Sequence, residues 1–315
     1  MEMRKVFSGY LREAMAHDTR LCVLDADLAN ANGTLSLRKD YPDRAFDVGI
    51  AEQNMASMAA GLASYGFIPF ITTFACFASR RICDQVAISC AYAKQNVKIV
   101  GTDPGITAEY NGGTHMAIED LGVLRSIPGL LLFEPCDEQE LLQGLPQIIQ
   151  HEGPVYLRLH RKETPVLHDE SYRFDLLRAD VFRPGTDVTL FASGCVMMNY
   201  ALEAASLLAE EGISAEIVDV HTVKPIDAET ILESAQRTGA AVTCENHNVI
   251  GGLYSAVCEA LASTCPIPVA AIGFGDVCGE VGSVPELAEK HHMLPKDIAA
   301  AARAVIRWKE RGTAQ

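Results

Sequence analysis

The alternation of short apolar runs with longer amphipathic segments is the feature of this sequence that most constrains its fold. Apolar runs of this kind are typical of buried strands, and apolar residues spaced three or four apart between them indicate helices. Strands that alternate with helices predict an α/β architecture with parallel sheets. Strands are expected over residues 21–24, 45–48, 69–74, 97–100, 130–133, 155–159, 188–191, 215–220, 241–244 and 269–272.

Helices are expected between these strands. The clearest ones cover residues 5–15, 76–93, 197–211, 227–238, 252–262 and 297–308. The helix over 76–93 would carry three cysteines on one face as small buried groups: Cys76, Cys83 and Cys90. A helix after residue 48 would bury one face formed by Met55, Met58, Ala59 and Leu62. Asp137 and Glu140 have capping-box spacing and predict a helix start, whereas residues 101–114 predict a glycine-containing loop.

The length of 315 residues suggests two domains. Residues 164–185 contain two prolines, many charges and no sustained period, which is typical of a connector. We therefore expect a first domain over residues 1–163 and a second over residues 186–315.

Charge and cysteine content limit the classes of partner and compartment. The formal net charge of −15 argues against nucleic acid or an anionic membrane as the main partner, because both need a basic face. The ten cysteines include no Cys-x-x-Cys pair, and so many unpaired thiols fit a reducing compartment. The uncharged stretch 55–79 is interrupted by Gly61, Gly66 and Pro69, so it predicts two buried elements in place of a membrane span. With no signal-peptide pattern at the N-terminus, a cytoplasmic protein is expected.

Glu52 is the first candidate for chemistry. It lies in residues 47–55 (Asp-Val-Gly-Ile-Ala-Glu-Gln-Asn-Met), where a predicted strand ends and a helix begins. Residues 53–79 contain no Asp, Glu, Lys or Arg, and a carboxylate in such apolar surroundings is expected to hold a proton or to find a cationic partner. Two interpretations are open: an acid-base group, or simply an acid favoured at a helix N-terminus.

Two further segments contain aromatic and imidazole side chains. Phe74 and Phe77 lie three apart where a strand passes into a helix, a pattern that core packing alone would explain. His115 lies in the run Asn-Gly-Gly-Thr-His over residues 111–115, ahead of a helix, where it could be a simple capping feature.

Together these segments resemble the transketolase family. The Gly-Ile-Ala-Glu-Gln-Asn run is similar to the family's glutamate motif, and residues 111–119 are similar to its Asp-Gly-Pro-Thr-His-Gln-Pro-Ile-Glu run. Residues 219–225 and 245–253 resemble its C-terminal domain, so the resemblance spans nearly the whole chain. It implies a pyrimidine-binding domain followed by a transketolase C-terminal domain, with thiamine diphosphate as the cofactor.

The resemblance implies roles around the cofactor. Glu52 would bond the N1′ atom of the aminopyrimidine ring and drive it towards the imino form that activates the cofactor. Phe74 and Phe77 would pack on this ring, with Phe77 stacked on it. Asp27, in an Ala-Asp-Leu run, would lie near the cofactor, and Arg80 stands at the pocket edge where the family usually has tyrosine.

The resemblance also implies roles around the substrate. His115 would be a catalytic residue that contacts substrate oxygens. Asn111 replaces an aspartate and Asp103 replaces a histidine among the family's substrate contacts. These two changes favour a substrate other than the ordinary sugar phosphates.

Arg4 and Arg158 would hold the distal anionic group of the substrate, because the planar guanidinium binds oxyanions bidentately. Two solvated surface arginines are the alternative. Ala31 stands where the family usually has a phosphate-binding serine, so the anion need not be a phosphate. An anionic, sugar-type substrate is therefore expected.

The diphosphate and magnesium site of this family needs a Gly-Asp-Gly sequence, which this chain lacks; the nearest string is Gly-Asp-Val over residues 275–277. We therefore expect no metal ligands here and magnesium bound on a partner chain. That partner would be an N-terminal-half transketolase subunit, giving an α2β2 heterotetramer with active sites between chains. The methionine shortly before Arg4 favours a naturally split subunit.

The leading hypothesis is a subunit that transfers a two-carbon ketol unit between a ketose and an aldose. One alternative is the β subunit of a 2-oxo acid dehydrogenase or a deoxyxylulose-phosphate synthase-like enzyme. The Thr-His-Met-Ala-Ile-Glu run over residues 114–119 favours a transketolase over these. The other alternative is a non-catalytic regulatory subunit, against which Glu52 and the paired aromatics argue.

Overall fold

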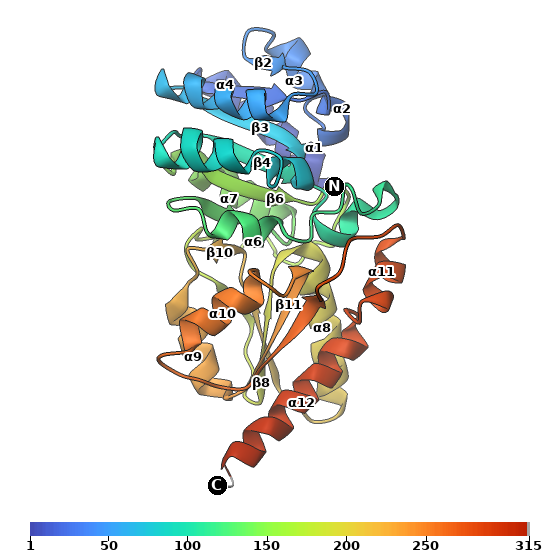
Figure 1. Ribbon diagram of the computed structural model, residues 1–315. Coiled ribbons are helices and arrows are strands. Elements are labelled where there is room, and N and C mark those ends of the chain that lie inside the picture. Colours follow the sequence, from blue (N-terminus) through green and yellow to red (C-terminus); the bar gives the residue numbers. More distant parts are fainter. Residues whose placement is uncertain (314–315) are drawn as a thin grey trace.

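A computed structural model describes residues 1–313, which form two α/β domains stacked one above the other (Figure 1). The predicted fold class is confirmed, since each domain contains a mainly parallel sheet with helices on both faces. Each sheet also has one antiparallel strand at an edge, β10 in the first and β7 in the second. Among the helices of residues 1–313, none has the length and apolar character that a membrane span needs.

The first sheet has seven strands in the order β10-β5-β6-β4-β3-β1-β2. Because all but β10 are parallel, their carboxyl ends meet at one edge. The strands are β1 (Leu21–Asp25), β2 (Ala45–Asp47), β3 (Ile68–Phe74), β4 (Lys98–Thr102), β5 (Leu131–Phe133), β6 (Val155–Leu159) and β10 (Thr222–Lys224).

Helices cover both faces of the first sheet. Helices α1 and α7 pack on one face, and α4, η1 and α6 pack on the other. The helical segments are α1 (Met3–His17), α2 (Ala29–Asn32), α3 (Leu35–Asp40), α4 (Glu52–Ser64), α5 (Ala75–Ala78), the π-helix η1 (Gln85–Tyr92), the 3₁₀ helix η2 (Gly105–Asn111), α6 (Asp120–Arg125) and α7 (Glu138–Gln150).

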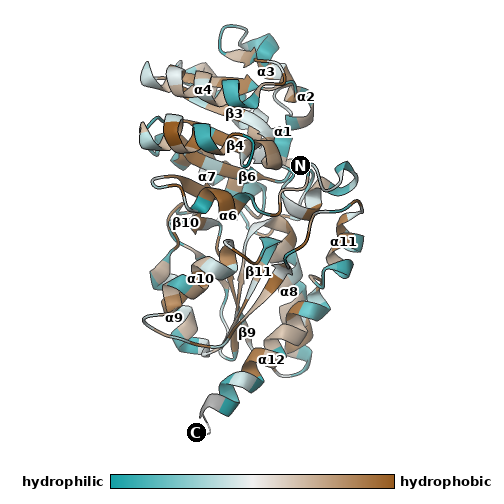
Figure 2. Ribbon diagram, in the orientation of Figure 1, coloured by the Kyte–Doolittle hydropathy of each residue, from teal (hydrophilic) through white to brown (hydrophobic). Residues whose placement is uncertain are grey.

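The second sheet has the strand order β12-β11-β8-β9-β7, with α8 and α12 on one face and α9 and α10 on the other. Figure 2 shows brown and teal segments along α12, as expected for a helix with one side on a sheet. The elements are β7 (Asp180–Arg183), β8 (Val188–Ala192), α8 (Gly194–Glu210), β9 (Ala215–Asp219), α9 (Ala228–Thr238), β11 (Ala241–Asn248), α10 (Leu253–Leu261), β12 (Val269–Phe274), α11 (Val284–Lys290) and α12 (Pro295–Thr313).

The helix predicted over residues 76–93 is wrong as a single element. It divides into α5 and η1, because Ser79 leaves the helical conformation at φ −117° and ψ −88°. Arg80 and Arg81 follow this break as exposed residues, while Cys76 and Cys90 are buried as expected. The break therefore brings two arginines to the carboxyl edge of the sheet.

Met58 was also placed wrongly, on the buried face of α4. It is 42% exposed, because the buried stripe of this helix runs through Met55, Ala56, Ala59 and Ala60. The predicted cap of α7 is confirmed in its first half, since Asp137 accepts a hydrogen bond from the Glu140 amide.

The two domains are joined by more than a connector. The predicted connector, residues 164–185, ends in β7, which pairs with β9 at the edge of the second sheet. The chain then returns from β9 through β10, which pairs with β5 in the first sheet. Domain limits at residues 163 and 186 stay a prediction.

Candidate functional site

Most of the candidate residues follow the carboxyl ends of strands in the first sheet. Asp27 follows β1, Glu52 follows β2, Phe77 follows β3 and Asp103 follows β4. Ligands of parallel α/β sheets bind at this edge, because the loops that leave the strands converge there. The fold therefore collects residues that are distant in sequence at one edge.

Glu52 begins α4 and its side chain is only 4% exposed. Its carboxylate accepts a hydrogen bond from Arg81 Nη1 at 2.6 Å. Glu52 also lies in the first turn of α4, where an acid is favoured, so the helix-terminus interpretation stands beside an acid-base role. A cavity of about 570 Å³ adjoins this pair and is lined by residues 50–54 and Arg81.

Three rings gather beside Glu52. The ring centroids of Phe74 and Phe77 are 6.0 Å apart, and the His115 ring lies 5.8 Å from the first and 5.3 Å from the second. The guanidinium carbon of Arg81 lies 3.7 Å from the Phe77 centroid. Arg81 thus links the ring cluster to Glu52, a contact that the sequence alone did not predict.

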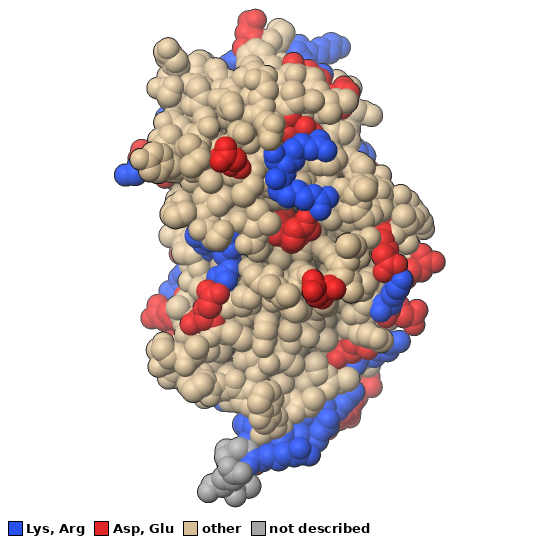
Figure 3. All heavy atoms as spheres, viewed as in Figure 1, with Lys and Arg blue, Asp and Glu red and all other residues tan. Residues whose placement is uncertain are grey.

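Arg80 and the second domain hold the His115 loop in place. Arg80 pairs with Glu119 at 2.5 Å and donates to the Thr114 carbonyl at 2.8 Å, so its contacts run to the loop. Thr114 Oγ1 lies 2.9 Å from His115 Nδ1. The second domain packs directly against this loop. A Cβ added to Gly113 would lie only 2.1 Å from the Gly279 carbonyl oxygen. In Figure 3, basic and acidic side chains adjoin in the middle of the first domain.

Arg4 and Arg161 meet at the backbone of Ala31. Both direct Nη1 towards the Ala31 carbonyl oxygen, at 3.0 Å and 3.5 Å. Arg161 also lies over Phe74, with its guanidinium carbon 5.1 Å from the ring centroid, and pairs with Asp103. The structure therefore places Arg161 next to Arg4, where the sequence had led us to expect Arg158.

The expectation that Arg158 holds a substrate anion is wrong. Its side chain is 0% exposed, and its nitrogens bond Asp120 at 2.8 and 3.1 Å, Glu134 at 2.7 Å and the Asn246 carbonyl at 2.8 Å. Burial opposes the charge of Arg158, but the two carboxylates raise its pKa overall. Arg158 is an interior residue of β6 that fixes the junction between the domains.

The remaining candidates differ in exposure. Asp103 is 3% exposed at a left-handed turn with φ 51°; burial raises its pKa and the nearby Arg161 opposes this. Asp27 and Asn111 are both exposed. Among residues 1–313, no hydrogen bond joins the Asn111 side chain to another candidate residue.

Two groups of potential metal ligands share Cys136: one adds Asp137 and His168, the other Glu140 and Asp219. Burial raises the pKa of Cys136 and of Asp219 well above their ordinary values. Because metal ligands must be deprotonated, these raised pKa values disfavour a metal ion in this cluster.

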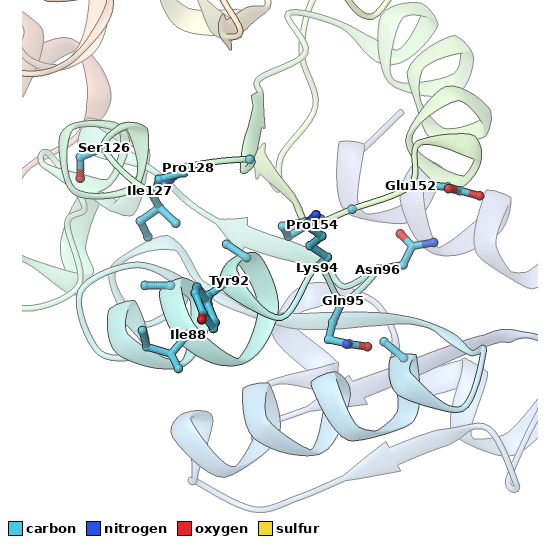
Figure 4. A pocket seen from close by; sticks show the side chains of 15 residues that line it. Ile88, Tyr92, Lys94, Gln95, Asn96, Ser126, Ile127, Pro128, Glu152 and Pro154 are labelled. Carbon is cyan, nitrogen blue, oxygen red and sulfur yellow. The ribbon is translucent and has the colours of Figure 1, made fainter.

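A separate cavity of about 1050 Å³ lies at the other edge of the first sheet (Figure 4). It is lined by residues ahead of β4, β5 and β6, including Asn96, Ile127 and Pro154, with Ile88 and Tyr92 from η1. Because it lies at the amino ends of these strands, it is not continuous with Glu52 or His115.

Comparison with known proteins identifies the family of both domains. The family described as transketolase, pyrimidine binding domain, matches residues 1–166, and transketolase, C-terminal domain, matches residues 177–298. The 6-deoxy-6-sulfo-D-fructose transketolase subunit SqwH of Clostridium sp. (strain MSTE9) is 49% identical over 98% of this chain and 95% of its own length. An apulose-4-phosphate transketolase subunit of Phocaeicola vulgatus is 35% identical over 87% of this chain and 87% of its own length.

Structural comparison gives the same family. A split-gene transketolase solved as an inactive β4 tetramer superposes with a TM-score of 0.88 at 40% identity, over 98% of this chain and 99% of that one. A 1-deoxy-D-xylulose-5-phosphate synthase of Geobacter sulfurreducens is 35% identical over 96% of this chain, which spans only 48% of the synthase. The chain therefore belongs to the thiamine diphosphate-dependent transketolase family and contains its pyrimidine-binding and C-terminal domains.

Proposed function

We propose that this chain is the cofactor-activating and substrate-binding subunit of a split transketolase, which transfers a two-carbon ketol unit from a ketose to an aldose. The observation that carries the proposal is the buried Glu52 carboxylate beside the rings of Phe74, Phe77 and His115, at the ligand-binding edge of the sheet. A buried acid and a stacking ring are what binding and protonating an aminopyrimidine require.

The residues present fit thiamine diphosphate. The Arg81 guanidinium lies on Phe77 and donates a hydrogen bond to Glu52, so a flat nitrogen-containing group can occupy the space between them. Glu52 and Phe77 would hold the aminopyrimidine ring in the same way, with Phe74 beside it. When bound, the cofactor supplies the nucleophilic carbon that carries the two-carbon unit.

Each of these side chains would then have a separate role in catalysis or binding. Glu52 would hold and return a proton at the N1′ atom of the cofactor. His115 would polarise a substrate oxygen through Nε2, because Thr114 is within hydrogen-bond reach of Nδ1. Arg80 would keep this loop in place through Glu119, and the exposed Asn111 would face a substrate hydroxyl group. The buried Asp103 would act on the substrate through its partner Arg161.

Arg4 and Arg161 would bind the distal anion of the substrate. Each arginine already pairs with a carboxylate, Arg4 with Glu2 at 3.0 Å and Arg161 with Asp103. This local neutralisation favours a monoanion over a phosphate, which carries a charge of about −1.5 to −2 at neutral pH. Together with the 49% identity to a 6-deoxy-6-sulfo-D-fructose transketolase subunit, it supports a sulfonate as the tail of the substrate.

The proposal includes a partner chain. Magnesium and the diphosphate contacts would lie on an N-terminal-half subunit, in an α2β2 assembly in the cytoplasm. Exposed apolar side chains on α4 and η1 support association, with Met58 at 42%, Ile88 at 57% and Tyr92 at 83% exposure. The synthase-like alternative is less specific, because this chain spans most of the transketolase subunits that it matches but 48% of the synthase.

Reconstitution tests the function. The isolated chain should fold but show no ketol transfer, and adding the partner subunit with thiamine diphosphate and magnesium should restore it. Transfer is measured by coupled assay or by NMR of the product sugars. Full turnover by the purified chain alone would contradict the split-subunit proposal.

The tail preference is tested by comparing six-carbon ketoses that differ only in carrying a 6-sulfonate or a 6-phosphate. The reconstituted pair should show the lower KM with the sulfonate. Arg161→Ala should raise the KM for this donor by about tenfold or more, since a hydrogen bond to a charged group contributes about 1.5–3 kcal/mol.

Glycolaldehyde, a neutral acceptor, is the matched control for the Arg161 variant, because it lacks the charged tail. Its KM should be unchanged in Arg161→Ala. Equal losses with charged and neutral substrates would assign Arg161 to the fold, and a lower KM with the phosphate would reject the sulfonate.

A further inference from the structure

Arg81 occupies the space between Glu52 and Phe77. Its Nη1 lies 2.6 Å from Glu52 Oε1, and its guanidinium carbon lies 3.7 Å from the centre of the Phe77 ring. The side chain is 41% exposed, whereas that of Glu52 is 4% exposed. A planar, delocalised cation thus stacks on the ring and donates a hydrogen bond to the carboxylate, which are the two contacts that the proposed function assigns to the aminopyrimidine.

The Arg81–Glu52 pair gives the buried carboxylate a partner when no cofactor is bound. A buried carboxylate without a partner is strongly destabilising, and no other basic side chain among residues 1–313 forms an ion pair with Glu52. The chain lacks the diphosphate-binding sequence, so the cofactor cannot be held firmly before the partner binds. Without the aminopyrimidine, Glu52 needs a proton or another cation, and Arg81 is the cation that pairs with it.

The geometry allows the side chain to move without its backbone. Gln53 Nε2 donates a hydrogen bond to the Arg81 carbonyl oxygen at 3.2 Å, which ties the residue next to Glu52 to the backbone of Arg81. The exposed end of Arg81 lines the cavity beside Glu52. Rotamer changes of exposed side chains take picoseconds to nanoseconds, so displacement affects the binding equilibrium more than its rate.

We propose that Arg81 is a displaceable placeholder for the aminopyrimidine: it pairs with Glu52 and stacks on Phe77 until the cofactor displaces it. This inference rests on the proposed cofactor site. It predicts that Arg81 stabilises the isolated chain and weakens cofactor binding, because only the fraction of molecules with Arg81 displaced can bind the cofactor.

The first experiment measures thiamine diphosphate binding to the reconstituted pair by calorimetry with magnesium present. Arg81→Ala should tighten the apparent Kd by about tenfold, which corresponds to the loss of one competing charge-assisted contact. Arg81→Lys keeps the charge but not the flat stacking group, so its Kd should lie between that of the wild-type pair and that of Arg81→Ala. Arg20→Ala, which removes an exposed arginine paired with Asp18, is the matched control and should change nothing.

The second experiment uses the isolated chain without cofactor. Arg81→Ala should lower its thermal unfolding midpoint, and the double variant Arg81→Ala/Glu52→Gln should recover most of the loss because the unpaired charge is gone. An unchanged or weaker Kd in Arg81→Ala would overturn the placeholder, as would a double variant no more stable than Arg81→Ala. If the wild-type pair binds no thiamine diphosphate at all, the proposed function fails instead, and the stability cycle still reports on the Arg81–Glu52 pair.

Discussion

Replacing Glu52 by glutamine is expected to lower the turnover of the reconstituted enzyme by about 100-fold or more, because a positioned acid-base group contributes roughly 10²–10⁴ in rate. Glutamine keeps the size of the side chain and can form a hydrogen bond, but it cannot exchange a proton with the N1′ atom. Since Glu52 is 4% exposed beside the ring cluster, water cannot readily replace it.

The step itself is followed by NMR, as exchange of the proton on the thiazolium carbon of bound cofactor. Exchange should slow in Glu52→Gln, while circular dichroism and cofactor affinity show an intact fold and an occupied site. Glu259→Gln is a matched control, because Glu259 is 64% exposed and pairs with Arg125 away from the site. Wild-type exchange in the Glu52 variant would mean that Glu52 only organises the helix.

The sequence predicted the fold because its two periodicities are local. The buried strands over residues 21–25 and 155–159 are mostly apolar runs, as expected for parallel strands that are covered on both faces. Such runs can be recognised in the sequence without any knowledge of contacts. Glu52 and His115 could be proposed because each belongs to a run with a recognisable family resemblance. What brings them together, the shared carboxyl edge of a parallel sheet, follows from the fold class itself.

Arg158 and Arg161 show where this reasoning reached its limit. Both are basic residues near the end of β6, and only the strand boundary separates an interior residue from one in the loop beyond it. β6 ends at Leu159, so Arg158 stays inside the sheet and Arg161 emerges at the site. The position relative to the strand end could have distinguished the two arginines, because ligand-binding residues follow a parallel strand more often than they lie within it.

Arg81 could not have been found from periodicity. The segment 76–93 has helical spacing, and the break at Ser79 arises because the chain must turn away from the end of β3 before η1 begins. The expectation that Glu52 needs a proton or a cation was the only signal for a basic partner. This expectation predicted that Glu52 needs a cation but not which residue supplies it. The identity of that residue depends on how the turn directs residues 80 and 81.

Arg158→Ala is expected to destabilise the chain by about 3–5 kcal/mol, the usual cost of removing one partner from a buried ion pair. Asp120 would lose the cation that, despite the opposing effect of burial, keeps its pKa low. Glu134, whose pKa burial already raises, would lose its ion pair as well. Thermal unfolding of the isolated chain measures the loss, with the exposed Arg20→Ala as the control.

The triple variant Arg158→Met/Asp120→Asn/Glu134→Gln tests whether the loss comes from the two carboxylates that Arg158→Ala leaves unpaired. It removes the charges together, so no buried charge is left without its partner, which is what makes the loss of a single partner costly. We therefore expect the triple variant to recover most of the stability lost in Arg158→Ala. In the reconstituted enzyme, any folded Arg158→Ala should lose activity equally on anionic and neutral substrates, because this side chain is 0% exposed and cannot contact a substrate. A selective rise in the KM for the anionic donor, with unfolding unchanged, would return Arg158 to the substrate site and contradict its burial within β6.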